Sequence, residues 1–196
     1  SYTEAQGLNG LVEDIFKVKN ILYVATSVGV YAYIDSRFIA VEGINSHTWS
    51  LKKFITATDT ILLVSSETGL YEVNKNKSKF IQAEYGFALH QSKINPNRVY
   101  MGMNDGLTSI KYENKKWIYE DYFNGIDYKI KNIEEDKKGN LWLATPVDGL
   151  IKVDFNPNSK DTLVTAWDEK YSIQYFDTTN GLPSMDNNIP YMYKNK

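Results

Sequence analysis

The chain has 196 residues, with 22 basic and 24 acidic side chains, a formal net charge of -2 and 42% hydrophobic residues. This composition is typical of one soluble globular domain, and all-β domains often reach such a length without dividing. The near-neutral charge, without a block of Lys or Arg, argues against a nucleic-acid partner. The sequence contains no apolar run of about 18 residues, so membrane insertion of this segment is not expected. The absence of cysteine excludes disulfides and thiolate metal sites.

An apolar run followed within a few residues by glycine and a large aliphatic residue occurs four times along the chain. The runs begin at Leu22, Leu62, Val99 and Leu141, and their glycines are Gly29, Gly69, Gly106 and Gly149. A period of about 40 residues is typical of β-propeller blades, each a four-stranded sheet, whereas paired-helix arrays repeat at about 33 or 34. We therefore predict an all-β chain of about four consecutive four-stranded propeller blades.

The first repeat shows the expected strands most clearly. Runs rich in Val, Ile, Tyr and Phe predict strands at 12–18, 21–26, 30–34 and 38–41, with turns between them. The recurrent glycine is expected to close the hairpin between the second and third strands, where φ is positive and a side chain would clash. Trp142 has the same place in its repeat as Tyr23, so both are expected in the core.

The whole chain is expected to form one propeller fragment, with blades over residues 11–48, 49–89, 90–129 and 130–184. Residues 185–196 resemble the opening strand of a further blade. A closed four-bladed ring is the competing possibility, since propellers have about four to eight blades. The incomplete fifth repeat, and the lack of a disulfide to latch the ends, favour an open arc or a fragment of a larger ring of about seven blades.

The fourth repeat also resembles a known repeat family. Its segment NIEEDKKGNLWLATPVDGLIKVD, residues 132–154, is similar to the repeat of the two-component regulator propeller family at Asp136, Gly139, Asn140, Leu141, Trp142, Thr145, Gly149 and Leu150. Ala144 stands where that family usually has glycine. A second family feature, a polar residue before Gly-Leu between blades, occurs at 6–10 and 180–188, with traces at 43–45 and 85–87.

This resemblance implies a function and a location. Members of the family are typically periplasmic sensor regions of hybrid histidine kinases, especially in Bacteroides-type gut bacteria that sense polysaccharide fragments. The resemblance implies that the chain is the periplasmic part of an inner-membrane protein. A membrane helix, a histidine kinase and a DNA-binding output domain would then lie downstream in the parent protein.

The residues themselves indicate no catalysis, metal or cofactor. The two histidines, His47 and His90, lie far apart in connections that lead into blades, and they lack a metal-binding spacing such as HExxH. Either could contact a ligand, but an ordinary loop role is the main alternative. Neighbouring carboxylates, such as Glu13-Asp14 and Glu134-Glu135, point to opposite faces of a strand, so solvated charge is expected rather than an acid-base dyad.

The connections between blades and the hairpins that follow the second strands are expected on one face, because antiparallel strands alternate in direction. Flat rings and polar groups in these segments suit stacking on sugars and hydrogen bonding to their hydroxyls. The candidate ligand-binding residues are Asn45, His47, Trp49, Glu67, Tyr85, Phe87, His90, Asp105, Tyr128, Lys129 and Asp148. An ordinary loop role is the alternative for each of them.

Three functions fit these observations, and the fold alone does not choose among them. The leading hypothesis is a non-catalytic sensor segment that recognises an oligosaccharide or a partner domain. The first alternative is a polysaccharide lyase or another carbohydrate-active enzyme, which needs a convergent cluster of His, Tyr or carboxylate groups. The second is a passive interaction scaffold. Exposed edge strands also predict self-association, whereas this segment is expected to contact neither nucleic acid nor membrane.

Overall fold

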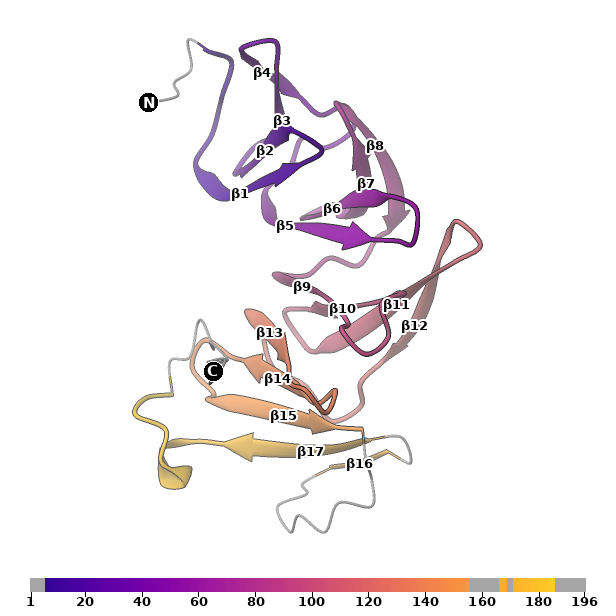
Figure 1. The fold of residues 1–196 in the computed structure, drawn as a ribbon. Coiled ribbons are helices and arrows are strands. Elements are labelled where there is room, and N and C mark those ends of the chain that lie inside the picture. Colours follow the sequence, from indigo (N-terminus) through magenta and orange to yellow (C-terminus); the bar gives the residue numbers. More distant parts are fainter. Residues whose placement is uncertain (1–5, 156–165, 169–170, 186–196) are drawn as a thin grey trace, which may run out of the picture. The chain divides into compact units, whose positions relative to one another are not determined.

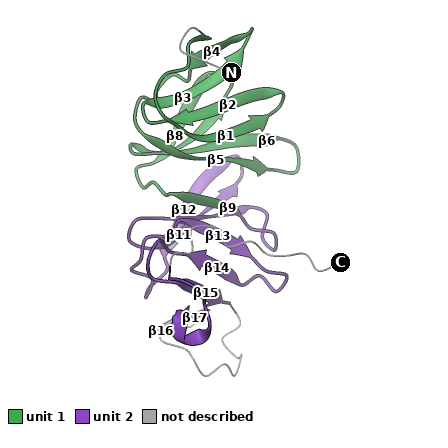
Figure 2. Cartoon of the chain, turned by 90° about the vertical axis from the view of Figure 1, so that its left-hand side faces the viewer, with its two compact units in different colours: residues 1–89 green, residues 90–196 purple. Residues whose placement is uncertain are grey.

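The computed structural model describes residues 6–155, 166–168 and 171–185 (Figure 1). These residues form four antiparallel β-sheets and the short 3₁₀ helix η2 (Thr178–Asn180). The chain divides into two compact units, residues 1–89 and 90–196 (Figure 2). Within the described ranges, no helix is long and apolar enough to cross a membrane.

The first sheet contains β1 (Val12–Val18), β2 (Ile21–Thr26), β3 (Gly29–Ile34) and β4 (Arg37–Ala40), in that order. Each strand begins and ends within one residue of its predicted bounds. The two-residue turns at 19–20 and 35–36 have positive φ at both positions, from 48° to 67°. This backbone is that of a type I′ turn, whose twist matches that of the two strands it joins.

The second sheet contains β5 (Thr48–Ile55), β6 (Thr60–Ser66), β7 (Gly69–Asn74) and β8 (Lys77–Gln82). The core of the first unit lies between the two sheets, where Tyr23 and Ala25 of β2 cluster with Leu62 and Val64 of β6. These residues alternate along their strands with others that face the opposite way. Every second side chain along these strands therefore points into this core, so one face of each sheet is buried there.

The other face of the first sheet carries a smaller cluster of Val24, Tyr31 and Phe38. Leu8, from the segment before β1, packs against these three side chains. Each of the three is less than a tenth exposed, at 2%, 9% and 5%. The Gly-Leu segment before β1 therefore covers part of a sheet face.

The third sheet contains β9 (Ala88–Gln91), β10 (Arg98–Gly102), β11 (Leu107–Glu113) and β12 (Lys116–Tyr122). The fourth contains β13 (Asn132–Glu135), β14 (Leu141–Ala144), β15 (Leu150–Asp154), β17 (Tyr171–Phe176) and β16 (Ala166–Asp168), in that spatial order. Four strands were predicted for this blade, and the fifth was missed. The three-residue β16 lies between the third and fourth strands of this blade along the chain, where the other repeats have only a short turn, and among the described strands it pairs only with β17, so the period gives no sign of it. Of the predicted further strand, residues 186–196 lie outside the described part.

The four repeated glycines lie in the hairpins between the second and third strands, with φ of 145°, 129°, 148° and 81° in chain order. A Cβ on Gly29 would lie 2.6 Å from the carbonyl oxygen of Ile44, and one on Gly106 would lie 2.7 Å from that of Ile126. Both carbonyls belong to the connection that follows the fourth strand. Positive φ and the close backbone approach therefore both require glycine here.

Candidate functional site

Four rings that were predicted to bind a ligand come together in the first unit. The Trp49 ring stacks on the His47 ring at a centroid distance of 4.9 Å and on the Tyr85 ring at 5.1 Å. The Phe87 ring meets the Trp49 ring edge-on at 5.0 Å. All four side chains are half-buried, so parts of the rings stay accessible to solvent. We call these four residues the ring stack.

Two β-bulges bring the polar and aromatic parts of this site together. The pairing register of β1 shifts between Val12 and Asp14, and that of β5 shifts between Thr48 and Ser50. The bulges leave Glu13 and Trp49 outside the regular ladders, and such an extra residue can direct its side chain to a new place. The carboxylate oxygen of Glu13 lies 3.0 Å from His47 Nε2, so residues of both bulges contact one imidazole.

One backbone and one side-chain hydrogen bond hold the His47 connection against the β6–β7 hairpin. The backbone N–H of Glu67 donates to the carbonyl oxygen of His47 at 2.8 Å. The hydroxyl of Ser46 lies 3.0 Å from that of Thr68. The connection and the hairpin thus lie on the same face of this unit, as the alternation of strand direction predicted.

A buried serine positions the other two rings. The hydroxyl of Ser65 donates to the carbonyl oxygen of Gly86 at 2.7 Å and accepts from the N–H of Gly86 at 2.8 Å. Ser65 is fully buried in β6 and so provides a rigid anchor. Because Gly86 lies between Tyr85 and Phe87, this pair of bonds fixes the backbone that carries both rings.

The arrangement combines the exposed parts of four aromatic rings with one polar pair at their edge. The side chains of His47 and Glu13 are 35% and 34% exposed. Ring faces stack on the apolar faces of sugars or other flat ligands, and the imidazole and carboxylate can exchange hydrogen bonds with hydroxyls. Glu13 was expected to be solvated charge, and it is exposed, but its carboxylate also contacts the His47 imidazole, which was not predicted. Sequence gives no sign of it because bulges are invisible in the apolar pattern.

The remaining predicted residues do not join the ring stack as side chains. Asn45 and Glu67 are exposed beside it in the first unit. In the second unit, Asp105 and Asp148 are exposed in the hairpins that precede β11 and β15, and Lys129 is half-buried in the connection before β13. Tyr128 lies in that same connection, with its ring 5.6 Å from that of Tyr175.

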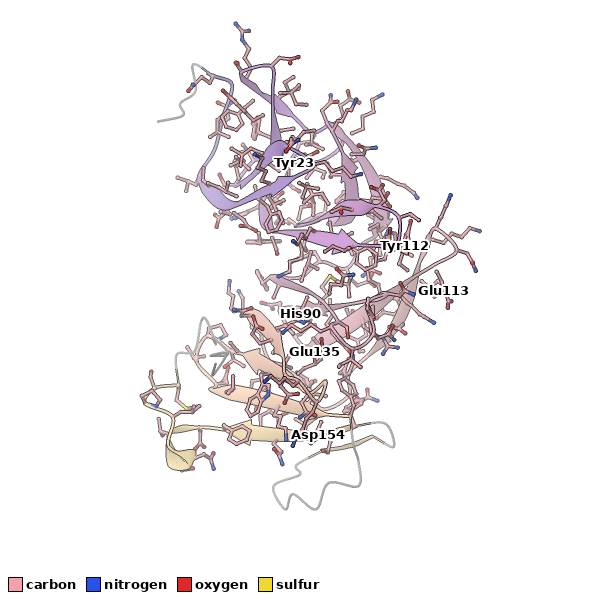
Figure 3. The ribbon with its side chains drawn as sticks, in the orientation of Figure 1. Tyr23, His90, Tyr112, Glu113, Glu135 and Asp154 are labelled. Atoms are coloured by element: carbon pink, nitrogen blue, oxygen red, sulfur yellow. The ribbon has the colours of Figure 1, made fainter. Side chains whose placement is uncertain are left out.

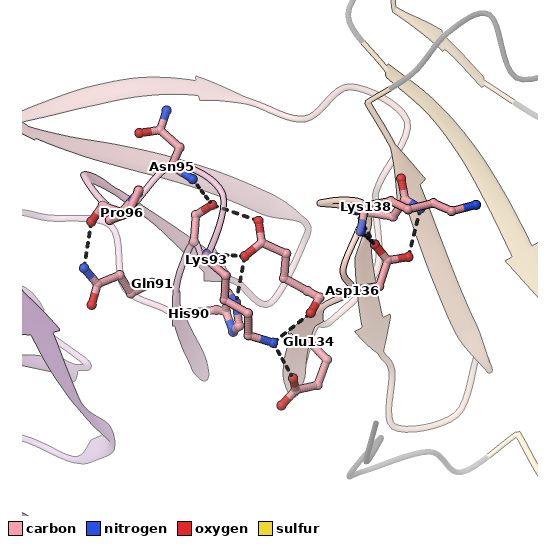
Figure 4. A network of polar contacts seen from close by, with 11 residues as sticks. His90, Gln91, Lys93, Asn95, Pro96, Glu134, Asp136 and Lys138 are labelled. Carbon is pink, nitrogen blue, oxygen red and sulfur yellow. Dashed lines mark hydrogen bonds and ion pairs between the residues drawn. The ribbon is translucent and has the colours of Figure 1, made fainter. Parts of the chain in front are cut away.

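His90 was expected in a connection on the ligand-binding face, and this expectation is wrong. It belongs to strand β9 and is only 6% exposed, with Nε2 lying 3.6 Å from an oxygen of Glu135 (Figure 3). Glu135 was expected to be solvated but is 2% exposed, because alternation turns it inward while Glu134 faces outward. The Ser92 hydroxyl donates to Glu135 at 2.8 Å, and the backbone N–H of Lys93 also donates to it (Figure 4).

Trp142 was expected in the core and is only half-buried, in contrast to Tyr23 at the same place in the first repeat. It lines an open hollow with Asp136, Asn140 and Lys152. Its indole N–H donates to the Asp136 carboxylate at 3.3 Å. Partial burial raises the pKa of Asp136, but hydrogen bonds from Asn140, the Lys138 backbone and Trp142 outweigh it and hold that pKa below its ordinary value.

The described part of the chain also contains side chains of the types that could bind a metal ion. Among those residues, no three His, Asp or Glu side chains gather as a metal site would require. The Glu13–His47 pair supplies only two such groups. The described site is therefore one of rings, an imidazole and a carboxylate.

Comparison with solved structures identifies the architecture. The chain is similar to the extracellular domain of BT4673 from B. thetaiotaomicron, with a TM-score of 0.63 and 17% identity, over 90% of this chain and 24% of that one. BT4673 is described there as a one-component system and, in a second structure, as a hybrid two-component system. An ancestral GH74 enzyme matches over 73% of this chain and 22% of its own, with a TM-score of 0.53 and 13% identity.

The WD40 β-propeller domain of Doa1 also matches, over 70% of this chain and 48% of its own, with a TM-score of 0.51 and 10% identity. The fold is that of a β-propeller. No protein-family model and no curated protein matches the sequence. Because identities are this low, the likeness concerns the fold, and a sensor domain and an enzyme share it.

Proposed function

We propose that the chain is the ligand-sensing, periplasmic part of a two-component sensor of the two-component regulator propeller family, and that its ring stack recognises an oligosaccharide. The observation that carries this proposal is the stack of half-buried rings, with Glu13 and His47 at its edge. The likeness to the extracellular domain of BT4673 supports the location and the signalling role. A parent histidine kinase would carry the catalytic activity, while this chain binds.

The chemistry of the ring stack suits a sugar more than a protein partner. The four rings are in contact and their atoms are held by packing, so little conformational entropy is lost when a ligand packs on their exposed parts. The carboxylate of Glu13 accepts hydrogen bonds from hydroxyls, and the imidazole of His47 can do the same or donate. A pyranose offers both an apolar C–H face and a rim of hydroxyls.

The test is a calorimetric screen of the purified chain against a panel of neutral and acidic oligosaccharides. At least one glycan is expected to bind, and Trp49→Ala is expected to weaken its binding by about tenfold or more, as the loss of one stacking ring does elsewhere. Trp117→Ala is the matched control, because Trp117 lies in β12 outside the ring stack. Failure of every glycan to bind, or equal losses in the two variants, would refute the sugar-binding site.

An enzyme is the second candidate, and one observation favours it. The Glu13–His47 pair, at 3.0 Å and beside the ring stack, has the geometry of a base oriented by a carboxylate. A lyase of acidic polysaccharides would use His47 to remove a proton. Incubation with such polysaccharides should then release unsaturated products that absorb in the ultraviolet, and His47→Ala should abolish them. Turnover that survives this change would exclude His47 as the base.

A further inference from the structure

A small cavity of about 160 Å³ lies between the first two sheets, at the end of β1 that is remote from Glu13. Aliphatic residues of both sheets line it, namely Val18 and Ile21 from the first and Ile61, Leu62 and Val73 from the second. All of them except the half-buried Ile21 are less than a tenth exposed. This part of the wall is therefore apolar, and it adjoins the core of the first unit.

Charged groups from three turns border the same cavity. Lys19 lies in the β1–β2 turn, Asp59 between β5 and β6, and Lys75 in the β7–β8 turn. The Lys19 ammonium lies 2.5 Å from the Asp59 carboxylate, and these side chains are 50% and 56% exposed, so this border is at the surface. Among the described residues, no carboxylate pairs with the ammonium of Lys75. These three groups together therefore carry a net positive charge.

One further carboxylate borders the cavity, that of Glu72 in β7. Its neighbours Tyr71 and Val73 both point into the core between the two sheets, so strand alternation turns the Glu72 side chain to the other face. There it lies opposite Lys79 in the β7–β8 ladder, a neighbour of opposite charge. Glu72 therefore leaves the positive charge at Lys75 unopposed.

The phenol of Tyr23 adds a hydrogen-bond donor beside Lys75. Tyr23 projects from β2, is 3% exposed and lines the cavity (Figure 3). Its oxygen accepts a hydrogen bond from the backbone N–H of Lys75, while burial raises the pKa of the phenol above its ordinary value. Because the phenol keeps its proton and its oxygen already accepts one bond, the O–H can donate to a ligand.

We propose that this cavity binds a short aliphatic monocarboxylate, with its hydrocarbon tail against the aliphatic residues and its carboxylate at Lys75 and Tyr23. An ammonium and a phenol O–H are both donors, and a carboxylate accepts from two donors at once. Burial of the tail removes apolar surface from water. A volume near 160 Å³ suits a ligand of about six non-hydrogen atoms, since a cavity of about 150 Å³ holds benzene. Butyrate and pentanoate are of this size.

This site is separate from the ring stack in place and in chemistry. The Glu13 carboxylate and the rings lie toward one end of β1 and β5, whereas the cavity lies beyond the other end of β1. A cavity of this size cannot hold a sugar chain, and its aliphatic walls suit a tail rather than a pyranose. The chain would thus have two sites for two classes of ligand.

An NMR titration of the ¹⁵N-labelled chain with straight-chain acids, from acetate to octanoate, tests the cavity. Each added methylene should tighten binding by about three- to fourfold while the tail is being buried. The gain should stop near pentanoate or hexanoate, once the cavity is full. Butylamine, of similar length but opposite charge, should bind at least about tenfold more weakly than pentanoate. No binding of any acid, or equal binding of the amine, would overturn the proposal.

Two variants test the residues that hold the carboxylate. Lys75→Met and Tyr23→Phe each remove one donor and keep the shape of the side chain, so each should weaken pentanoate binding by about fivefold or more. Lys77→Met is the matched control, because Lys77 is equally classed as exposed but does not line the cavity. Equal weakening by Lys75→Met and Lys77→Met would show a general effect of charge and would refute the site. Circular dichroism checks that each variant is folded.

Discussion

Replacing Gly29 by alanine should reveal how strongly the hairpin depends on glycine. At φ of 145°, a side chain costs about 1–2 kcal/mol of backbone strain. The new Cβ would also lie 2.6 Å from the carbonyl oxygen of Ile44, and only a shift of backbone would relieve that contact. We expect a total loss of about 3 kcal/mol in the free energy of unfolding, a large effect for one methyl group.

Gly10→Ala is the matched control within the same unit. Gly10 also has positive φ, at 85°, but its Cβ would meet side-chain atoms rather than backbone: Val28 Cγ2 at 2.8 Å, and Ser27 Oγ and Thr26 Oγ1 each at 3.0 Å. Val28 can rotate away and the two hydroxyl contacts need only small shifts, so the expected loss is about 1–2 kcal/mol. Urea unfolding followed by Trp49 fluorescence, in a background where the other tryptophans are phenylalanine, measures both. Equal losses in the two variants would refute the role given to the Ile44 carbonyl.

Three further predictions concern stability. Glu135→Ala should lower the free energy of unfolding by about 2–4 kcal/mol, because it leaves buried partners such as His90 without their carboxylate. Glu134→Ala, at a half-exposed position, should change that free energy little. Urea unfolding measures both variants, and equal losses would contradict the prediction. Because the pKa of Asp136 is lowered in the folded state, its ionised carboxylate stabilises the fold above about pH 4, and this stabilisation is lost as the pH falls through the pKa of the folded state. Asp136→Asn should therefore make the free energy of unfolding depend less on pH in the acid range. Ser36→Gly should raise the free energy of unfolding by about 0.5–1 kcal/mol, because Ser36 has φ of 66° and glycine adopts positive φ without strain. A lower midpoint of thermal unfolding than that of the parent chain would count against this.

The repeat could be found in the sequence because it depends on residues that lie close together along the chain. A strand of alternating apolar residues followed by a hairpin glycine needs no distant contact to be recognised, and β1 to β4 lie within one residue of their predicted bounds. The side chains of the ring stack were also foreseen, since His47, Trp49, Tyr85 and Phe87 all lie in or beside connections.

The sequence could not show which residues surround each side chain in the folded protein. Alternation says that Glu134 and Glu135 point to opposite faces, but only the packing of β13 shows that Glu135 is the buried one. The same limit applies to Trp142, whose position in the repeat matches that of the buried Tyr23 although its surroundings differ. The Glu13 contact was missed for another reason, because a bulge changes register without changing composition.

The paired bulges of β1 and β5 bear on how this protein can change over time. A residue that stands outside the ladder has no cross-strand partner to satisfy, so its replacement does not disturb the hydrogen-bonded register on either side. Changes at positions 13 and 49 should therefore leave the strand register intact, although those at position 49 remove the contacts of Trp49 with the rings of His47, Tyr85 and Phe87. A library randomised at these two positions should yield many folded variants with different binding preferences, which would make this edge of the molecule a natural starting point for directed evolution.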